Sequence, residues 1–313
     1  MKNLPSDIIL AILQIVDNTN LKTNEPMALH TTFKVGGPAD YFATPTTTDA
    51  FIKLIMFCAE SNLPYFILGK GSNLIVSDKG IRGLVISTSK LTRVVYRENQ
   101  VTASCGFELI KLSRNTARRG LSGLEFACGI PGSVGGAVYM NAGAYEGEIS
   151  QVLVSSQVLV LNKKENGSIT AEVKTITNKE HDFAYRHSII QDKGYIHLSS
   201  TFNLLPFNRS FIQANIRKLT KSREEKQPLE LPSAGSVFRR PQGYFTGKLI
   251  EDCGLKGFRI GDAAVSVKHC GFIVNLGNAT AKDILSLIEH VQATIHKRFG
   301  VTLQTEVKFA GEK

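Results

Sequence analysis

Glycine-rich segments are the residues of this chain best placed to do chemistry, because bare backbone can approach a charged ligand closely. Of its 27 glycines, seven fall between Gly123 and Gly147. Glycine adopts positive φ without strain and has no Cβ, so successive N–H groups can point at one anion. The segment leads into an apolar helical stretch, Val134–Met140, whose N-terminus would add donors. We predict a phosphate-binding loop with the candidate contacts Gly129, Pro131, Gly132, Ser133, Gly135, Gly136, Asn141 and Gly143.

A second loop of this kind follows the apolar run Tyr65–Leu68 and offers glycines, a hydroxyl and an amide, which suit a pyrophosphate. Its candidate contacts are Gly69, Lys70, Gly71, Ser72 and Asn73. It has neither the third glycine of a G-x-G-x-x-G motif nor the G-K-[ST] ending of a P-loop. A third glycine turn lies within Thr31–Asp40. Any one loop is well explained as a tight turn, but the three together favour an extended, multiply phosphorylated ligand, a dinucleotide-like cofactor.

The composition is that of an ordinary globular protein with an excess of positive charge. Apolar residues make up 42% and charged residues 20% of the 313, and the formal net charge is +10. Such a charge suits either nucleic acid or small polyanions such as nucleotides. The basic residues are scattered, except for a cluster of Arg217, Lys218, Lys221, Arg223 and Lys226, and tryptophan is absent. Small anionic ligands are therefore favoured over single-stranded nucleic acid.

Cysteine usage and the N-terminal segment indicate a reducing compartment. The five cysteines are scattered without a C-x-x-C pair, which argues against a disulfide framework or a zinc site. The short apolar run Ile8–Leu13 lies between acidic residues and has no small-residue cleavage site, so it predicts an amphipathic helix rather than a signal peptide. We expect a cytoplasmic protein.

Apolar periodicity predicts the elements that must hold these loops. Helices are expected over 46–62, 107–119, from about 207 to 226, and over 280–299, the last with a capping box at Thr280 and Asp283 and with Gly300 just past its end. The apolar stripe of this last helix would include Ile284, Ile288, Val291, Ile295 and Phe299. Strands are expected at 65–68, 83–86, 92–96, 100–103, 152–161, 194–202 and 301–309. The class is α+β, with domains over 1–88, 89–204 and 205–313.

Taken together and in order, these motifs resemble one family closely. The segments His30–Asp40, Leu68–Val76 and Gly129–Gly143 resemble the flavin-binding motifs of the UDP-N-acetylenolpyruvoylglucosamine reductase family, also called UDP-N-acetylmuramate dehydrogenases. The likeness continues through Tyr185–Ser188, Ala234–Pro241, Ala263–Asn275 and Thr305–Val307. The compact stretch 188–207 resembles the shorter class of members, which lack a tyrosine-bearing insertion over the substrate.

The resemblance implies a fold, a cofactor and a reaction. The first two domains would form a noncovalent FAD site of the vanillyl-alcohol-oxidase (PCMH) type, and the third would close over a UDP-sugar. NADPH would reduce the flavin, and reduced N5 would then give hydride to the enolpyruvyl methylene of UDP-N-acetylglucosamine enolpyruvate. The product, UDP-N-acetylmuramate, is a precursor of the peptidoglycan cell wall. The protein would act as a monomer, without nucleic acid, membrane or metal.

The same resemblance assigns site residues. Arg186 would hold the carboxylate, Ser236 would donate the proton to carbon, and Glu306 would hydrogen-bond the developing enolate. Tyr185, Lys226 and Arg240 would contact the substrate, although Arg240 stands where some members have asparagine. From periodicity alone, Glu306 lies on the polar, solvated side of its strand. His269, in a predicted strand, is interpreted as a structural histidine.

Two other functions fit the same residues less well. A carbohydrate oxidase of the same fold would react with oxygen, and many such enzymes tether the flavin covalently. A basic binding protein without chemistry would be colourless, and its affinity for nucleic acid would depend steeply on salt. A yellow preparation with bound flavin would exclude the binding protein, whereas the reductase and the oxidase would both be yellow.

Overall fold

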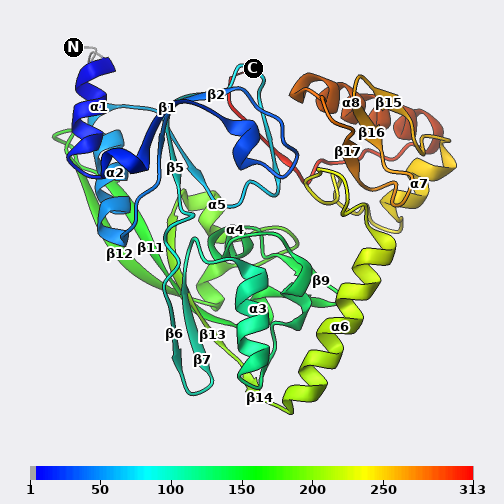
Figure 1. Ribbon diagram of the computed structural model, residues 1–313, viewed down its shortest axis with the longest axis horizontal. Coiled ribbons are helices and arrows are strands. Elements are labelled where there is room, and N and C mark those ends of the chain that lie inside the picture. Colours follow the sequence, from blue (N-terminus) through cyan, green and yellow to red (C-terminus); the bar gives the residue numbers. More distant parts are fainter. Residues whose placement is uncertain (1–4, 313) are drawn as a thin grey trace. The chain divides into compact units, whose positions relative to one another are not determined.

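The computed structural model describes residues 5–312 and divides the chain into two compact units built from interleaved segments (Figure 1). The first unit takes in the residues up to 23, then 41–70 and 83–221, and the second takes in 24–40, 71–82 and the residues from 222 onwards. The domains expected over 1–88, 89–204 and 205–313 therefore stay a prediction. A compact unit of the fold need not coincide with a region that binds cofactor or substrate.

The first unit contains a five-stranded antiparallel sheet in the order β12-β11-β13-β7-β6 (Figure 1). Its strands are β6 Val94–Arg97, β7 Gln100–Ser104, β11 Leu153–Lys163, β12 Ile169–Thr177 and β13 Ile196–Asn203. All but β12 coincide with predicted strands. β12 was not predicted, although Ile169, Ala171 and Val173 alternate with polar residues; the alternation ends at Thr175, and most side chains of this edge strand are exposed.

A second sheet has the order β1-β2-β5-β3, with β1 Leu21–Pro26, β2 Pro38–Ala43, β3 Tyr65–Leu68 and β5 Ile81–Ser87. β3 pairs in parallel with β5. The helices α1 Pro5–Leu13 and α2 Thr48–Ser61 belong to the first unit. α2 confirms the helix predicted over 46–62, and its apolar residues Phe51, Leu54, Ile55 and Cys58 are buried; Thr47 caps its start and Asn62 ends it at φ +52°.

Shorter elements of the first unit carry its loops. They are α3 Leu109–Arg118, α4 Val134–Tyr139, α5 Ile189–Lys193, the β9–β10 hairpin (Gly143–Ala144 and Gly147–Glu148), the pair β8 Leu121–Ser122 and β14 Leu205–Pro206, and the 3-10 turns η1 Asn18–Asn20, η3 Glu125–Gly129, η4 Ile149–Gln151 and η5 Lys179–His181. The long helix α6 Arg209–Lys226 begins in the first unit and ends in the second.

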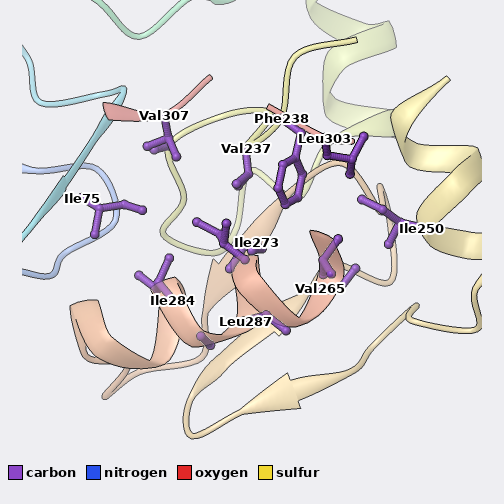
Figure 2. Close-up of a cluster of buried hydrophobic side chains, with 14 of the residues drawn as sticks. Ile75, Val237, Phe238, Ile250, Val265, Ile273, Ile284, Leu287, Leu303 and Val307 are labelled. Atoms are coloured by element: carbon purple, nitrogen blue, oxygen red, sulfur yellow. The ribbon is translucent and has the colours of Figure 1, made fainter. Parts of the chain in front are cut away.

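The second unit packs α7 Thr246–Asp252 and α8 Ala281–Phe299 with the antiparallel strands β15 Arg259–Ile260, β16 Ala263–Val265 and β17 Ile273–Asn275. It also contains η2 Met27–His30 and the parallel pair β4 Leu74–Val76 and β18 Lys308–Ala310. Figure 2 shows side chains from these elements meeting in one buried apolar cluster, to which Ile284 and Leu287 contribute from α8.

The C-terminal elements confirm one prediction and correct two others. Thr280 and Asp283 form the expected capping box at the start of α8, and Gly300 ends it at φ +69°. Phe299, however, is 36% exposed rather than part of the buried stripe, and Arg298 lies over its ring. The strand predicted over 301–309 is limited to β18, which pairs with the three-residue β4; before it, Thr305 forms only an isolated bridge with Phe238. Among residues 5–312, no helix is long and apolar enough to cross a membrane.

Candidate active site

The loop that follows β3 keeps its backbone donors unused. In the described part of the chain, the N–H groups of residues 69–73 donate no hydrogen bond. The carbonyl groups, by contrast, are engaged: Gly71 O accepts from Thr32 N–H at 3.2 Å and Asn73 O accepts from Lys308 N–H at 3.0 Å. Unpaired N–H groups in a half-buried segment are costly unless a ligand or water accepts from them. The arrangement suits an anionic ligand.

Within the first unit, Gly69 lies directly against the second glycine-rich loop. A Cβ added to Gly69 would lie 2.5 Å from Ser133 Oγ, closer than real Cβ atoms come to their neighbours. Lys70 reaches Glu108 at 3.4 Å, and Glu108 pairs with Ser133 in an isolated β-bridge. The two loops are therefore neighbours in the fold, and a side chain at position 69 would displace the Ser133 hydroxyl.

Within the second unit, Gly71 lies against the third glycine turn. It has φ +60°, and an added Cβ would meet His30 O at 2.1 Å. Two residues after His30, the hydroxyl of Thr32 is buried with no hydrogen-bond partner among the described residues. Leaving such a group unpaired costs about 1–3 kcal/mol, so this atom is a candidate ligand contact. The turn was predicted from its glycines, whereas Thr32 was not predicted as a contact, since a threonine beside a glycine turn carries no signal of its own.

The start of α4 corrects one expectation. Its first N–H groups were expected to add donors for a phosphate, but they are hydrogen-bonded within the protein: Val134 N–H to Phe107 O at 2.8 Å, Gly135 N–H to Cys105 O at 2.8 Å, and Gly136 N–H to Ser133 Oγ at 3.3 Å. Since those donors are used, α4 offers no free N-terminal N–H group to an anion.

Other predicted contacts in the Gly129–Gly143 loop also have partners within the protein. A Cβ at Gly143 would meet Gly147 O at 2.7 Å, and one at Gly135 would meet Cys105 O at 3.1 Å, so both glycines are needed for packing. Gly129 ends η3, Gly132 O accepts from Leu109 N–H, and Pro131 is exposed. Asn141 is only 1% exposed.

Arg186 lies in the first unit at the tip of a tight turn. The turn runs from Ala184 to His187, which form an isolated β-bridge, and Tyr185 and Arg186 are its central residues. Arg186 has φ +57°, a left-handed conformation that costs a non-glycine residue about 1–2 kcal/mol. Its guanidinium donates to Gly143 O at 3.4 Å and lies 5.0 Å from the centre of the Tyr185 ring. Strained residues of this kind cluster at functional sites.

The second unit brings Ser236 and Glu306 together. Glu306 N–H donates to Val237 O at 2.7 Å, so the backbone of Glu306 lies beside the residue that follows Ser236. Asn73 Nδ2 in turn donates to Glu306 O at 3.1 Å, which connects the end of the β3 loop to the same place. Ser236 is exposed, whereas Glu306 is half-buried rather than solvated as its periodicity indicated, because it precedes β18 and lies outside any regular strand.

The other predicted substrate contacts lie at the surface. Tyr185 is 51% exposed, and Lys226 is exposed at the C-terminal end of α6. Arg240, in the second unit, lies 4.0 Å from the centre of the Phe245 ring and donates through Nε to Tyr244 O at 3.2 Å.

His269 lies beside Ser236 in a turn between β16 and β17, not in the predicted strand. Its Nδ1 accepts from Gly271 N–H at 3.1 Å, and burial lowers the pKa of the imidazole. A Cβ added to Gly271 would lie 2.9 Å from His269 Cε1 and 3.9 Å from Ser236 Oγ. Because the neutral ring accepts this hydrogen bond and so fixes the backbone of the turn at Gly271, the geometry agrees with a structural histidine.

Two family models match this chain. Residues 227–310 match the C-terminal domain of UDP-N-acetylenolpyruvoylglucosamine reductase, and residues 39–167 match an FAD-binding domain. The predicted class is thereby confirmed: an α+β FAD-binding module of the vanillyl-alcohol-oxidase type, followed by a C-terminal substrate domain.

Individual relatives match over nearly the whole chain. The UDP-N-acetylenolpyruvoylglucosamine reductase of Clostridium novyi is 50% identical over 307 residues, 98% of this chain and 97% of the relative. That of Clostridium beijerinckii is 48% identical over 96% of each chain. The crystal structure of the enzyme from Thermus caldophilus is similar with a TM-score of 0.75 at 34% identity, over 91% of this chain and 97% of that one. The chain therefore belongs to the UDP-N-acetylenolpyruvoylglucosamine reductase family.

Proposed function

We propose that this chain reduces UDP-N-acetylglucosamine enolpyruvate to UDP-N-acetylmuramate in peptidoglycan precursor synthesis, with FAD as cofactor and NADPH as reductant. The near-full-length identity to reductases of this name and the match to an FAD-binding domain support the reaction and the cofactor. The net charge of +10 suits a substrate and a cofactor that both carry phosphates. Action as a monomer in the cytoplasm is part of the same proposal.

The residues present fit FAD. The unused N–H groups of residues 69–73 and the unpaired Thr32 hydroxyl are donors of the kind that a pyrophosphate and polar ring atoms require. Gly69, Gly71 and Ser72 would hold it through backbone contacts. When bound, the flavin supplies the hydride that reaches the enolpyruvyl methylene.

Arg186 would bind and orient the substrate carboxylate. Hydride addition at the methylene leaves negative charge on the neighbouring carbon, which is delocalised into that carboxylate. A permanently charged guanidinium fixed in place stabilises such charge better than mobile water. The left-handed backbone at Arg186 supports this role, because strain at an exposed turn is expected where the side-chain direction matters.

Ser236 Oγ would deliver the proton to the neighbouring carbon, and Glu306 would hydrogen-bond the enolate oxygen. The observation that carries this assignment is the Glu306 N–H to Val237 O hydrogen bond of 2.7 Å, which sets Glu306 beside the residue that follows Ser236 in one unit. Because Ser236 is exposed, its hydroxyl can reach a bound substrate. A hydroxyl is a weak acid, but the carbanion-like centre is strongly basic, so a well-positioned serine can protonate it.

An anaerobic stopped-flow experiment tests the proposed reaction. NADPH should bleach the flavin absorbance of the purified protein, and UDP-N-acetylglucosamine enolpyruvate should then restore it, with UDP-N-acetylmuramate formed in equal amount. UDP-N-acetylglucosamine, which lacks the enolpyruvyl group, should leave the flavin bleached. If the flavin is reoxidised rapidly by oxygen and ignores the enolpyruvyl sugar, the substrate assignment fails and an oxidase is favoured.

Replacing Gly71 with alanine should abolish flavin binding and destabilise the protein by about 3 kcal/mol. The new Cβ would carry the cost of a left-handed residue, about 1–2 kcal/mol, and would also collide with the His30 carbonyl. The ratio of flavin to protein absorbance after purification, and thermal unfolding, measure the two effects.

Gly300→Ala is the matched control. Gly300 has φ +69°, but an added Cβ meets nothing within 4 Å, so this variant carries the backbone penalty without the collision. It should retain full flavin and lose about 1 kcal/mol. A Gly71→Ala protein that purifies with stoichiometric flavin would exclude this loop as the cofactor site.

A further inference from the structure

The Asn141 side chain makes three hydrogen bonds inside the first unit. Its Nδ2 donates to Glu148 Oε1 at 3.1 Å and to Ala184 O at 3.2 Å, and its Oδ1 accepts from Ser150 N–H at 3.0 Å. The side chain is only 1% exposed. Both amide hydrogens are therefore used, and little capacity remains for a ligand. The sequence pattern indicated a flavin contact for Asn141, but its amide could donate to a flavin only if one of the two Nδ2 hydrogen bonds broke.

The partners of Asn141 lie on the two segments that frame Arg186. Ala184 begins the tight turn, and its carbonyl also accepts from His187 N–H at 3.1 Å, so Asn141 holds the base of the turn from outside. Glu148 belongs to the β9–β10 hairpin, whose Gly143 O accepts from the Arg186 guanidinium. Asn141 therefore ties the backbone of the turn to the hairpin that its arginine contacts.

The Arg186 turn needs such a clamp. With φ +57° at Arg186, the local backbone preference favours a different conformation by about 1–2 kcal/mol, enough to change the population of the turn by roughly tenfold. On the other side, Gln191 Nε2 donates to Arg186 O at 3.2 Å. Asn141 is itself left-handed at φ +42°, a conformation that asparagine and aspartate tolerate better than other side chains.

We propose that Asn141 is a positioning residue for Arg186: its buried amide fixes the Ala184–His187 turn against the β9–β10 hairpin and so aims the guanidinium at the substrate carboxylate. This inference rests on the proposed function, since it assumes that Arg186 binds that carboxylate. It also reassigns Asn141 from the cofactor to the substrate half of the reaction.

Asn141→Asp tests the proposal, because aspartate keeps the shape and the left-handed backbone but loses both amide donors. Its carboxylate would face the acceptors Glu148 and Ala184 O, and the turn should loosen. We expect a 10- to 100-fold slower reoxidation of the reduced flavin by UDP-N-acetylglucosamine enolpyruvate, about the range found when the support of a site residue is removed. FAD affinity of the apoprotein and the rate of flavin reduction by NADPH should stay within about twofold of the parent protein. Asn62→Asp, at an exposed left-handed asparagine that caps α2, is the matched control. It should change neither half-reaction and should leave the FAD affinity as it is.

A paired exchange separates positioning from general stability. In Asn141→Asp with Glu148→Gln, the introduced glutamine amide can donate to the introduced carboxylate, so the link to the hairpin returns while the link to Ala184 O stays lost. We expect this double variant to recover the melting temperature of the parent protein but not its sugar half-reaction. Recovery of both together would overturn the proposal, because Asn141 would then act only through the stability of the hairpin. Lower FAD affinity in Asn141→Asp would overturn it too, and would return the residue to the cofactor site.

Arg186→Gln distinguishes failure of this inference from failure of the proposed function. If Arg186 binds the carboxylate, Arg186→Gln alone slows the sugar half-reaction, and adding Asn141→Asp to it causes little further loss, because the two residues act as one unit. If Asn141→Asp slows the sugar half-reaction of the Arg186→Gln protein as much as it slows that of the parent protein, Asn141 acts independently of Arg186. An Arg186→Gln protein with a normal sugar half-reaction contradicts the assigned role of Arg186 itself.

Discussion

Ser236→Ala is expected to leave flavin reduction by NADPH intact and to slow the sugar half-reaction by about 10²–10⁴. Removing a general acid typically costs this much, because the proton must then come from unpositioned water. The two half-reactions share the flavin but not the proton donor, so only the second should respond. Single-turnover flavin absorbance, first with NADPH and then with UDP-N-acetylglucosamine enolpyruvate under anaerobic conditions, measures each step separately.

Binding of the sugar should change far less than its reduction. As proton donor, the Ser236 hydroxyl would contribute in the transition state, when the proton moves, and a group of that kind alters the rate constant rather than the affinity. The dissociation constant, read from the perturbation of the flavin spectrum, should therefore stay within a few-fold of the parent value. Ser286→Ala, on α8 of the same unit, serves as the control. Equal loss in both half-reactions, or a loss confined to affinity, would refute the assignment of Ser236 as the proton donor.

Local signals in the sequence were sufficient for the longer helices, whereas the short helices α5 and α7 were not predicted. In α2, the cap at Thr47, the left-handed end at Asn62 and the buried stripe all depend on residues within one or two turns of each other. The capping box of α8 is local in the same sense. Strand limits depend on partners far along the chain, which is why the strand expected over 301–309 is formed only where it meets β4.

The site was less predictable, because its geometry depends on contacts that sequence distance hides. Glycine enrichment marked the loops, but the pattern could not reveal that Phe107 and Cys105 carbonyls already accept the N–H groups at the start of α4. The left-handed backbone of Arg186 was equally invisible, since glycine and asparagine are the usual signals for that conformation. For Glu306, the alternation rule assumed a regular strand where the chain is irregular.

A buried chain of polar side chains links η5 to strands β11 and β13 of the five-stranded sheet and predicts a strong dependence of stability on pH. His181 Nε2 lies 2.8 Å from Ser156 Oγ, which lies 2.6 Å from Ser200 Oγ, which in turn lies 2.6 Å from His197 Nε2. Both imidazoles are buried, and in each the Nδ1 atom has no partner among the described residues. The serines supply one proton each to these three hydrogen bonds. One histidine must therefore donate through Nε2 and the other accept, which both can do while neutral.

Burial keeps both histidines neutral well below their ordinary pKa. It lowers the pKa of His181 to about 4 and that of His197 to about 3, against 6.5 for an exposed imidazole. Between pH 6.5 and these values the unfolded chain binds protons that the folded chain does not, so stability falls as the pH falls. From about pH 7.5 to about pH 5, each histidine should cost about 2 kcal/mol, or about 4 kcal/mol for the pair. Against a typical stability of about 5–15 kcal/mol, that is a large share.

Urea unfolding at about pH 7.5 and about pH 5, followed by circular dichroism, measures this loss, and paired substitutions assign it. In His181→Gln with His197→Gln, the side-chain amides can still donate to or accept from the serines but do not titrate. This variant should be less stable near neutral pH, yet should lose about 4 kcal/mol less than the parent protein on acidification. The control variant combines His290→Gln with His296→Gln, at two exposed positions on α8. It should lose as much stability on acidification as the parent protein does. If the two double variants lose the same stability on acidification, burial does not hold His181 and His197 neutral, and the predicted dependence on pH is wrong.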